Sequence, residues 1–118
     1  MKSLFIINAS PHGTERAYNA LRLAHALAKK DSPTEVATVF LMVDAVLAAK
    51  GGQKTPEGFY NVERMLKQVL AANGRVLRCG TCMDARGIGE TELMEGARRS
   101  TKDELAAATI EADKVLVF

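Results

Sequence analysis

Residues 3–28, SLFIINASPHGTERAYNALRLAHALA, contain a strand, a turn and a helix in the order that decides the fold. The apolar run from Ser3 to Ala9 is unbroken, as in a parallel strand that is buried on both faces. A turn-rich loop follows and reaches Gly13. From Thr14, a residue type typical of helix N-caps, apolar residues recur every three or four positions, which predicts a helix with one buried face. This stretch therefore predicts the opening of an alternating α/β fold.

The rest of the chain repeats the alternation of strand and helix. Further strands are predicted at 36–43, 75–79, 96–99 and 114–118, and further helices at 45–50, 55–70 and 101–112. Asp31 to Thr34 is expected to end the first helix, Thr55-Pro56 to start the third, and residues 80–90 to form a glycine-bearing loop. Strands that are separated by helices pair in parallel. We expect one domain, residues 1–118, built as a three-layer α/β sandwich with a mainly parallel sheet of about five strands.

Composition narrows the classes of function. Of the 118 residues, 47% are apolar and 25% are charged, which is ordinary for a folded globular domain. A net charge of +2, 5% aromatic residues and the lack of tryptophan disfavour nucleic acid as a partner. The longest apolar stretch, Val36 to Ala49, contains Asp44 and falls short of the roughly 20 residues of a spanning helix. No secretory pattern is present, so we expect a cytoplasmic protein that does not bind membranes.

The motif Cys79-Gly80-Thr81-Cys82 is the sharpest chemical signal in the chain. It follows a predicted strand, and chemistry in parallel sheets gathers beyond the carboxyl ends of the strands. Backbone N–H groups in the glycine-bearing turn and the charge of Arg86 would lower the pKa of a thiol there. The alternative is that both cysteines are small buried packing residues.

Three chemistries could use this pair of thiols. Disulfide exchange fits the spacing, but the thioredoxin-like fold places a proline later in the chain and starts a long helix at the pair, whereas here a loop is expected. A zinc site needs four ligands, and the sequence has neither a second cysteine pair nor a close histidine pair. Sulfur transfer needs one nucleophilic thiol and tolerates a second. The residues alone leave the choice among these chemistries open, and they indicate no metal and no cofactor.

Other residues at the same predicted edge have two interpretations each. The loop from Ser10 to Thr14 could cradle an anion or a flavin phosphate, or it could simply form a turn. Asp44 is interpreted first as a helix N-cap, and otherwise as a group that orients a substrate. His12 could act as a general base or be a solvated loop histidine. His25 has no assigned role, and the Arg98-Arg99 pair is interpreted as surface charge or a subunit contact.

Several separated motifs resemble one known family. They are Phe40-Leu41-Met42-Val43-Asp44-Ala45-Val46, Gly52-Gln53-Lys54, the two-cysteine motif followed by Arg86-Gly87, and Ala112-Asp113-Lys114-Val115-Leu116 close to Phe118. Together they resemble the DsrE/DsrF-like family over essentially the whole chain, and most closely its YchN-like branch. The resemblance implies a compact α/β fold with a parallel sheet. It also implies homo-oligomers, with a hexamer built as a trimer of dimers for that branch.

The same resemblance implies a site. Relatives in sulfur relays carry sulfur as a cysteine persulfide, on a cysteine that precedes an Arg-Gly pair by a short interval. Cys79, ahead of Arg86-Gly87, is the match, whereas Cys82 has no counterpart in relatives with a single cysteine. We therefore expect Cys79 to accept sulfane sulfur from a donor protein and to pass it to an acceptor. Cys82 would be a resolving or second carrier thiol.

Supporting roles are expected for a small set of neighbours. Arg86, Gly80 and Gly87 would stabilise the thiolate and the persulfide anion, and Asp44 and His12 would line the same pocket. Alternatives stay open at this point. They are an oligomeric binding module for a small ligand or anion, a flavodoxin-like flavin binder, and a thiol-disulfide redox protein.

Overall fold

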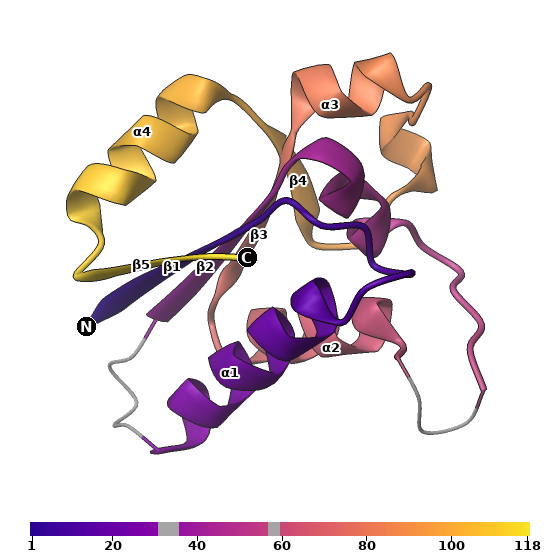
Figure 1. The fold of residues 1–118 in the computed structure, drawn as a ribbon. Helices are drawn as coiled ribbons and strands as arrows, with labels where there is room; N and C mark the ends of the chain where they lie inside the picture. The colour runs from indigo at the N-terminus through magenta and orange to yellow at the C-terminus, as the bar shows by residue number, and fades with distance from the viewer. Residues whose placement is uncertain (31–35, 57–59) are drawn as a thin grey trace.

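The computed structural model describes residues 1–30, 36–56 and 60–118. Its strands form one parallel sheet in the order β4-β3-β2-β1-β5 (Figure 1). The strands are β1 (Lys2–Ile7), β2 (Val36–Leu41), β3 (Arg75–Cys79), β4 (Ala97–Ser100) and β5 (Lys114–Val117). The expected five-stranded parallel sheet is confirmed.

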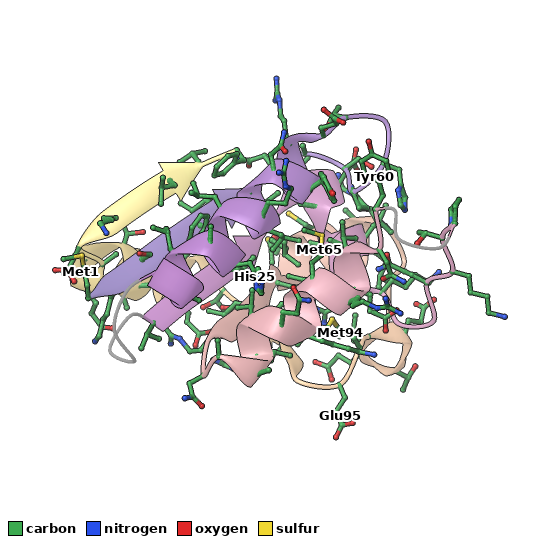
Figure 2. All side chains as sticks on the ribbon, turned by 90° about the horizontal axis from the view of Figure 1, so that it is seen from below. Met1, His25, Tyr60, Met65, Met94 and Glu95 are labelled. Atoms are coloured by element: carbon green, nitrogen blue, oxygen red, sulfur yellow. The ribbon has the colours of Figure 1, made fainter. Side chains whose placement is uncertain are left out.

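Helices cover both faces of the sheet, as a three-layer sandwich requires (Figure 1). On one face lie α1 (Arg16–Lys30) and α2 (Val62–Ala71), and on the other lie α3 (Gly80–Ala85) and α4 (Lys102–Glu111). Neighbouring residues of β1 show why its run of apolar residues is unbroken. Phe5 belongs to the core under α1 and α2, whereas Leu4 belongs to the core on the opposite face of the sheet. Figure 2 shows α1 and α2 side by side, with His25 between them.

The predicted helix start at Thr101 holds, because this residue caps α4 by accepting from the Glu104 N–H at 3.2 Å. Helix α1 begins at Arg16, two residues after the predicted cap Thr14, whose hydroxyl accepts a hydrogen bond from the Arg16 backbone N–H at 3.4 Å. The third helix does not begin at Thr55-Pro56. Its N-cap is Asn61, whose side-chain oxygen accepts from the Arg64 N–H at 3.0 Å. Residues 57–59, and the expected end of the first helix at residues 31–35, lie outside the described residues.

Two further corrections concern the carboxyl edge of the sheet. Residues 80–85, expected to be a loop, form α3, which begins directly after Cys79. The short helical segment after β2 is the 3₁₀ helix η1 (Val43–Ala49), and its N-cap residue is Met42, which makes no side-chain capping bond. Asp44 lies inside the first turn of η1 and is not the cap. Because β2 and β3 are neighbours, η1 and α3 leave the sheet side by side (Figure 1).

No helix in the described parts of the chain is both long enough and apolar enough to cross a bilayer.

Candidate functional site

The two cysteines lie where β3 passes into α3. Cys79 is the last residue of β3 and the N-cap residue of α3, and Cys82 lies in the first turn of that helix. Both are free thiols. Cys79 is only 4% exposed, whereas Cys82 is partly exposed. The Cys79 sulfur lies 3.2 Å from the Thr81 hydroxyl oxygen. The strand-end position predicted from the sequence is therefore confirmed, and the two thiols share one helical turn.

The two thiols differ in acidity. Burial raises the pKa of Cys79, but hydrogen bonds from the Thr81 hydroxyl, the Cys82 thiol and the backbone N–H groups of Cys82 and Thr81 outweigh burial, so that this pKa lies below its ordinary value. Burial also raises the pKa of Cys82, and the hydrogen bond to Cys79 raises it further. A neighbouring pair in this state holds its negative charge on Cys79 and its proton on Cys82.

A backbone group of η1 completes the surroundings of Cys82. The Val43 N–H donates to the Cys82 sulfur at 3.2 Å. Val43 has a φ of 56°, which is the left-handed region and is strained for a β-branched residue. Val43 is also 42% exposed, so burial of its side chain does not explain the conformation. The strained backbone aims an N–H group at the sulfur.

Arg86 ties α3 to η1. Its Nε donates to the Asp44 carboxylate at 2.8 Å, and its Nη1 donates to the Cys82 carbonyl oxygen at 3.1 Å. Its positive charge acts to lower the pKa of Cys82, although the net pKa of that thiol stays raised. Asp44 therefore serves as the partner of Arg86, and the interpretation of Asp44 as an N-cap is wrong. Asp44, Arg86 and Cys82 are brought together as one cluster.

Gly87 explains why arginine and glycine stand together in this motif. Gly87 has a φ of 64° and ends α3 in a left-handed turn, with its N–H donating to the Asp84 carbonyl oxygen at 3.1 Å. The Ile88 N–H donates to the Met83 carbonyl oxygen at 3.0 Å, and these two buried side chains lie in the same core. This pattern is a Schellman motif. The turn leaves the preceding Arg86 at the helix end, where its side chain folds back onto Cys82.

Arg99 is a site residue that the sequence reasoning missed. From β4 it pairs with the Asp84 carboxylate through two hydrogen bonds of 2.8 Å. It also lies directly over Gly80, where an added Cβ would come within 2.7 Å of its guanidinium carbon. The Cys79 thiolate is one of the charges that raise the pKa of Arg99, after Asp84 and Glu90. Gly80 therefore gives room to a cation beside Cys79, and the surface interpretation of Arg99 is incomplete.

His12 is not brought into the cysteine cluster. Its backbone N–H donates to the Ser10 hydroxyl at 3.3 Å. Together with Gly13 and Thr14 it lines a separate cavity of about 460 Å³, whose other walls include Lys54 and Tyr60. None of the cysteine-site residues lines that cavity. The prediction that His12 shares a pocket with Asp44 gains no support from this placement.

Metal ligands are also not gathered at the site. In the described residues no three side chains among His, Cys, Asp and Glu come close enough to bind an ion together. What the cluster offers is a nucleophilic sulfur, a neighbouring proton donor and two arginines that are each held by a carboxylate. These groups suit an anion that forms and is consumed on sulfur.

Replacing Thr81 with valine should slow alkylation of Cys79 at neutral pH by about 10-fold. The hydroxyl hydrogen bond stabilises the thiolate, and a hydrogen bond to a charged group contributes about 1.5 kcal/mol. The measurement is the iodoacetamide rate at Cys79, followed by peptide mass. The Thr109→Val variant on α4, whose hydroxyl bonds the Leu105 carbonyl oxygen, is the control and should react at the wild-type rate. Equal rates for both variants would contradict the role of Thr81.

Comparison with known proteins bears on the family and the fold. The model of the DsrE/DsrF-like family matches residues 1–118. Protein YchN of Escherichia coli K12 is 44% identical over 117 residues, which cover 99% of this chain and 98% of that protein. An uncharacterized protein of Methanocaldococcus jannaschii is 39% identical over 118 residues, or 100% of both chains.

The structural comparison gives the same result. The crystal structure of YchN from E. coli matches with a TM-score of 0.93 at 42% identity and covers 100% of this chain and 99% of that one. A protein of unknown function from Methanobacterium thermoautotrophicum shares the fold at a TM-score of 0.79 with 14% identity, covering 99% of this chain and 98% of that one. The resemblance drawn from the sequence motifs is confirmed, and the chain belongs to the DsrE/DsrF-like family.

Proposed function

We propose that this protein handles sulfane sulfur, and that Cys79 accepts it as a persulfide and passes it on. The observation that carries the proposal is the Thr81 hydroxyl, which lies 3.2 Å from the Cys79 sulfur and favours the thiolate. Family membership supports the same reading, because this family is linked to sulfur relay. The alternative of two inert packing cysteines does not account for a hydroxyl at 3.2 Å from the Cys79 sulfur and for a pKa that lies below its ordinary value despite burial.

The transfer is a displacement at sulfur. The Cys79 thiolate attacks the outer sulfur of a donor persulfide, R–S–SH, forming Cys79–S–SH while the donor leaves as its thiolate. The reverse displacement, by an acceptor thiolate on the outer sulfur, regenerates Cys79. The Cys79 thiolate and the deprotonated persulfide are both anions, so the Thr81 hydroxyl and the nearby charge of Arg99 stabilise each form in turn.

The two single-thiol variants test this assignment as a matched pair. After reduction and a brief exposure to a persulfide donor, Cys82→Ser should gain one sulfur atom that a thiol reductant removes, and Cys79→Ser should gain none. The measurement is intact mass before and after reduction. Reversal by reductant separates a persulfide from a sulfinic acid, which thiols do not reduce. Loading of Cys79→Ser, or of neither variant, would contradict the proposal.

We also propose that the chain assembles with copies of itself, as a hexamer built from three dimers, in a reducing cytoplasmic compartment. Three large apolar side chains support self-assembly: Ile110 on α4 is 85% exposed, and Val115 and Val117 on the edge strand β5 are 43% and 65% exposed. A thiol that must stay reduced to accept sulfur fits that compartment. Light scattering at micromolar concentration should give the mass of a hexamer, and a monomer would contradict the assembly.

A further inference from the structure

We propose that Cys82 resolves the persulfide on Cys79, so that the site releases hydrogen sulfide and is left as a Cys79–Cys82 disulfide. The inference rests on the proposed function, because it starts from a persulfide on Cys79. The inference goes beyond the proposed function, because it assigns a second activity to Cys82, the reductive release of the sulfur. A protein that only carries sulfur does not need this thiol.

The first support is the placement of the two sulfurs. Cys79 and Cys82 are three positions apart at the start of α3, and residues at that spacing are neighbours on one side of a helix. The Cys82 thiol lies close enough to lower the pKa of Cys79, while its own pKa is raised. With a rise of about 1.5 Å per residue on a radius of about 2.3 Å, Cα atoms three positions apart in a helical turn lie about 5 Å apart, which is within the Cα separation that a disulfide bridges.

The second support is that two hydrogen bonds hold Cys82 in place. The Val43 N–H bonds its sulfur at 3.2 Å, and Arg86 bonds its carbonyl oxygen at 3.1 Å. Arg86 is in turn fixed by the Asp44 carboxylate at 2.8 Å. A cysteine that served only for packing would need none of these contacts. They keep the Cys82 sulfur beside Cys79, and they place an N–H group where negative charge develops when Cys82 loses its proton.

The proposed step balances in atoms and charge. The Cys82 sulfur attacks the inner sulfur of Cys79–S–S⁻, the Sγ–Sγ bond forms, and the bond to the outer sulfur breaks. The proton of Cys82, which is already directed at Cys79, moves to the departing sulfur, which leaves as HS⁻. The outer sulfur is reduced by two electrons and the two cysteines are oxidised by the same number. The persulfide itself is the oxidant.

Return to the dithiol form requires an external thiol of low molecular mass or a protein dithiol. Two such thiols reduce the Cys79–Cys82 disulfide and become a disulfide themselves. Cys82 is the more exposed of the two sulfurs, so the attacking thiol meets it first and Cys79 leaves as the stabilised thiolate. The leaving thiol of lower pKa departs faster. The differences in exposure and in pKa between Cys79 and Cys82 therefore suit both the release of sulfide and the reduction of the disulfide.

Glutathione persulfide is the probe that tests this step, because its leaving group on transfer is glutathione and not sulfide. Reduced wild-type protein, Cys82→Ser and Cys82→Ala are loaded without oxygen and passed rapidly through gel filtration. Intact mass and released sulfide are then followed over time. Wild-type protein should release one sulfide per chain and end two hydrogens lighter than its reduced form. Both Cys82 variants should keep the added sulfur and release none.

The outcomes separate this inference from the proposed function. If wild-type protein holds its added sulfur as stably as Cys82→Ser, Cys82 does not resolve the persulfide, while the carrier role of Cys79 stands. If no variant gains sulfur and the wild type releases none, both proposals fail. Wild-type protein kept without donor under the same conditions should stay a dithiol. A disulfide in that sample would show oxidation that does not depend on sulfur, and would overturn the inference.

Discussion

Replacing Arg78 with methionine should stabilise the protein. Arg78 is fully buried in β3, and within the described residues none of its three side-chain nitrogens has a hydrogen-bond partner. Burial lowers the pKa of its guanidinium to about 10, with Glu90 acting against that shift and Arg99 adding to it. A buried charge without a partner is unfavourable. Methionine is unbranched, fills a similar space and carries no charge.

The expected gain in the free energy of unfolding is on the order of 2 kcal/mol at neutral pH. Urea denaturation of both forms measures it. The pH dependence has a definite sign. Because the folded pKa of Arg78 is lowered, the folded state binds fewer protons than the unfolded state from about pH 10 up to the higher, ordinary pKa of arginine. The wild type should therefore regain free energy of unfolding only as the pH rises through that window. At neutral pH the advantage of Arg78→Met over the wild type is fully present.

The control for this substitution is Arg75→Met, at the exposed start of the same strand, where the side chain donates to the Thr38 hydroxyl at 3.2 Å. Loss of that part-buried hydrogen bond should lower stability slightly. If Arg78→Met lowered stability as well, the guanidinium would contribute favourably, and the account of Arg78 would be wrong.

Gly74→Ala should destabilise the protein by about 3 kcal/mol, the upper part of the range for overpacking. A Cβ at this position would lie 2.6 Å from the Ala37 carbonyl oxygen and 2.8 Å from that of Val69. These are backbone atoms of β2 and α2. The Gly74 N–H also donates to the Val69 carbonyl oxygen at 2.9 Å, so the chain cannot move away without losing that bond.

Urea or thermal denaturation measures the effect, and Gly89→Ala is the matched control. Gly89 has a φ of −88°, and its nearest neighbour would be 3.9 Å from the added Cβ. That variant should unfold like the wild type. If Gly74→Ala were as stable as the wild type, the close backbone packing described around Gly74 would be wrong.

The fold could be predicted from the sequence wherever burial dictates the pattern. Strand β3 has the predicted bounds, Arg75–Cys79, because an apolar run follows the stop signal Asn73-Gly74. The prediction is wrong at α3, because the glycines of residues 80–90 indicate a loop whereas residues 80–85 form a helix. Position 80 requires a glycine because the Arg99 side chain lies over it. Arg99 is on β4, so the requirement comes from a tertiary contact. Local sequence does not carry that information.

The site was predictable to the same extent. Cys79, Cys82 and Arg86 follow from the rule that chemistry gathers beyond strand ends. Val43 contributes a backbone N–H, which leaves no signature in its side chain. Arg99 reaches the site through the register of β4 against β3, and Asp44 through the contact of η1 with α3. Such pairings depend on tertiary structure, so the sequence places Asp44 at the correct edge of the sheet but does not show that Arg86 is its partner.

The most direct test of the central claim is the position of the sulfur on the wild-type protein. Cleavage after Arg78 and Arg86 yields one peptide, residues 79–86, that contains both cysteines of the chain. Protein exposed briefly to glutathione persulfide, alkylated at once and digested would be fragmented to locate the extra sulfur. The account predicts it on Cys79. Sulfur found first on Cys82, or on neither cysteine in a sample that has released no sulfide, would contradict the account.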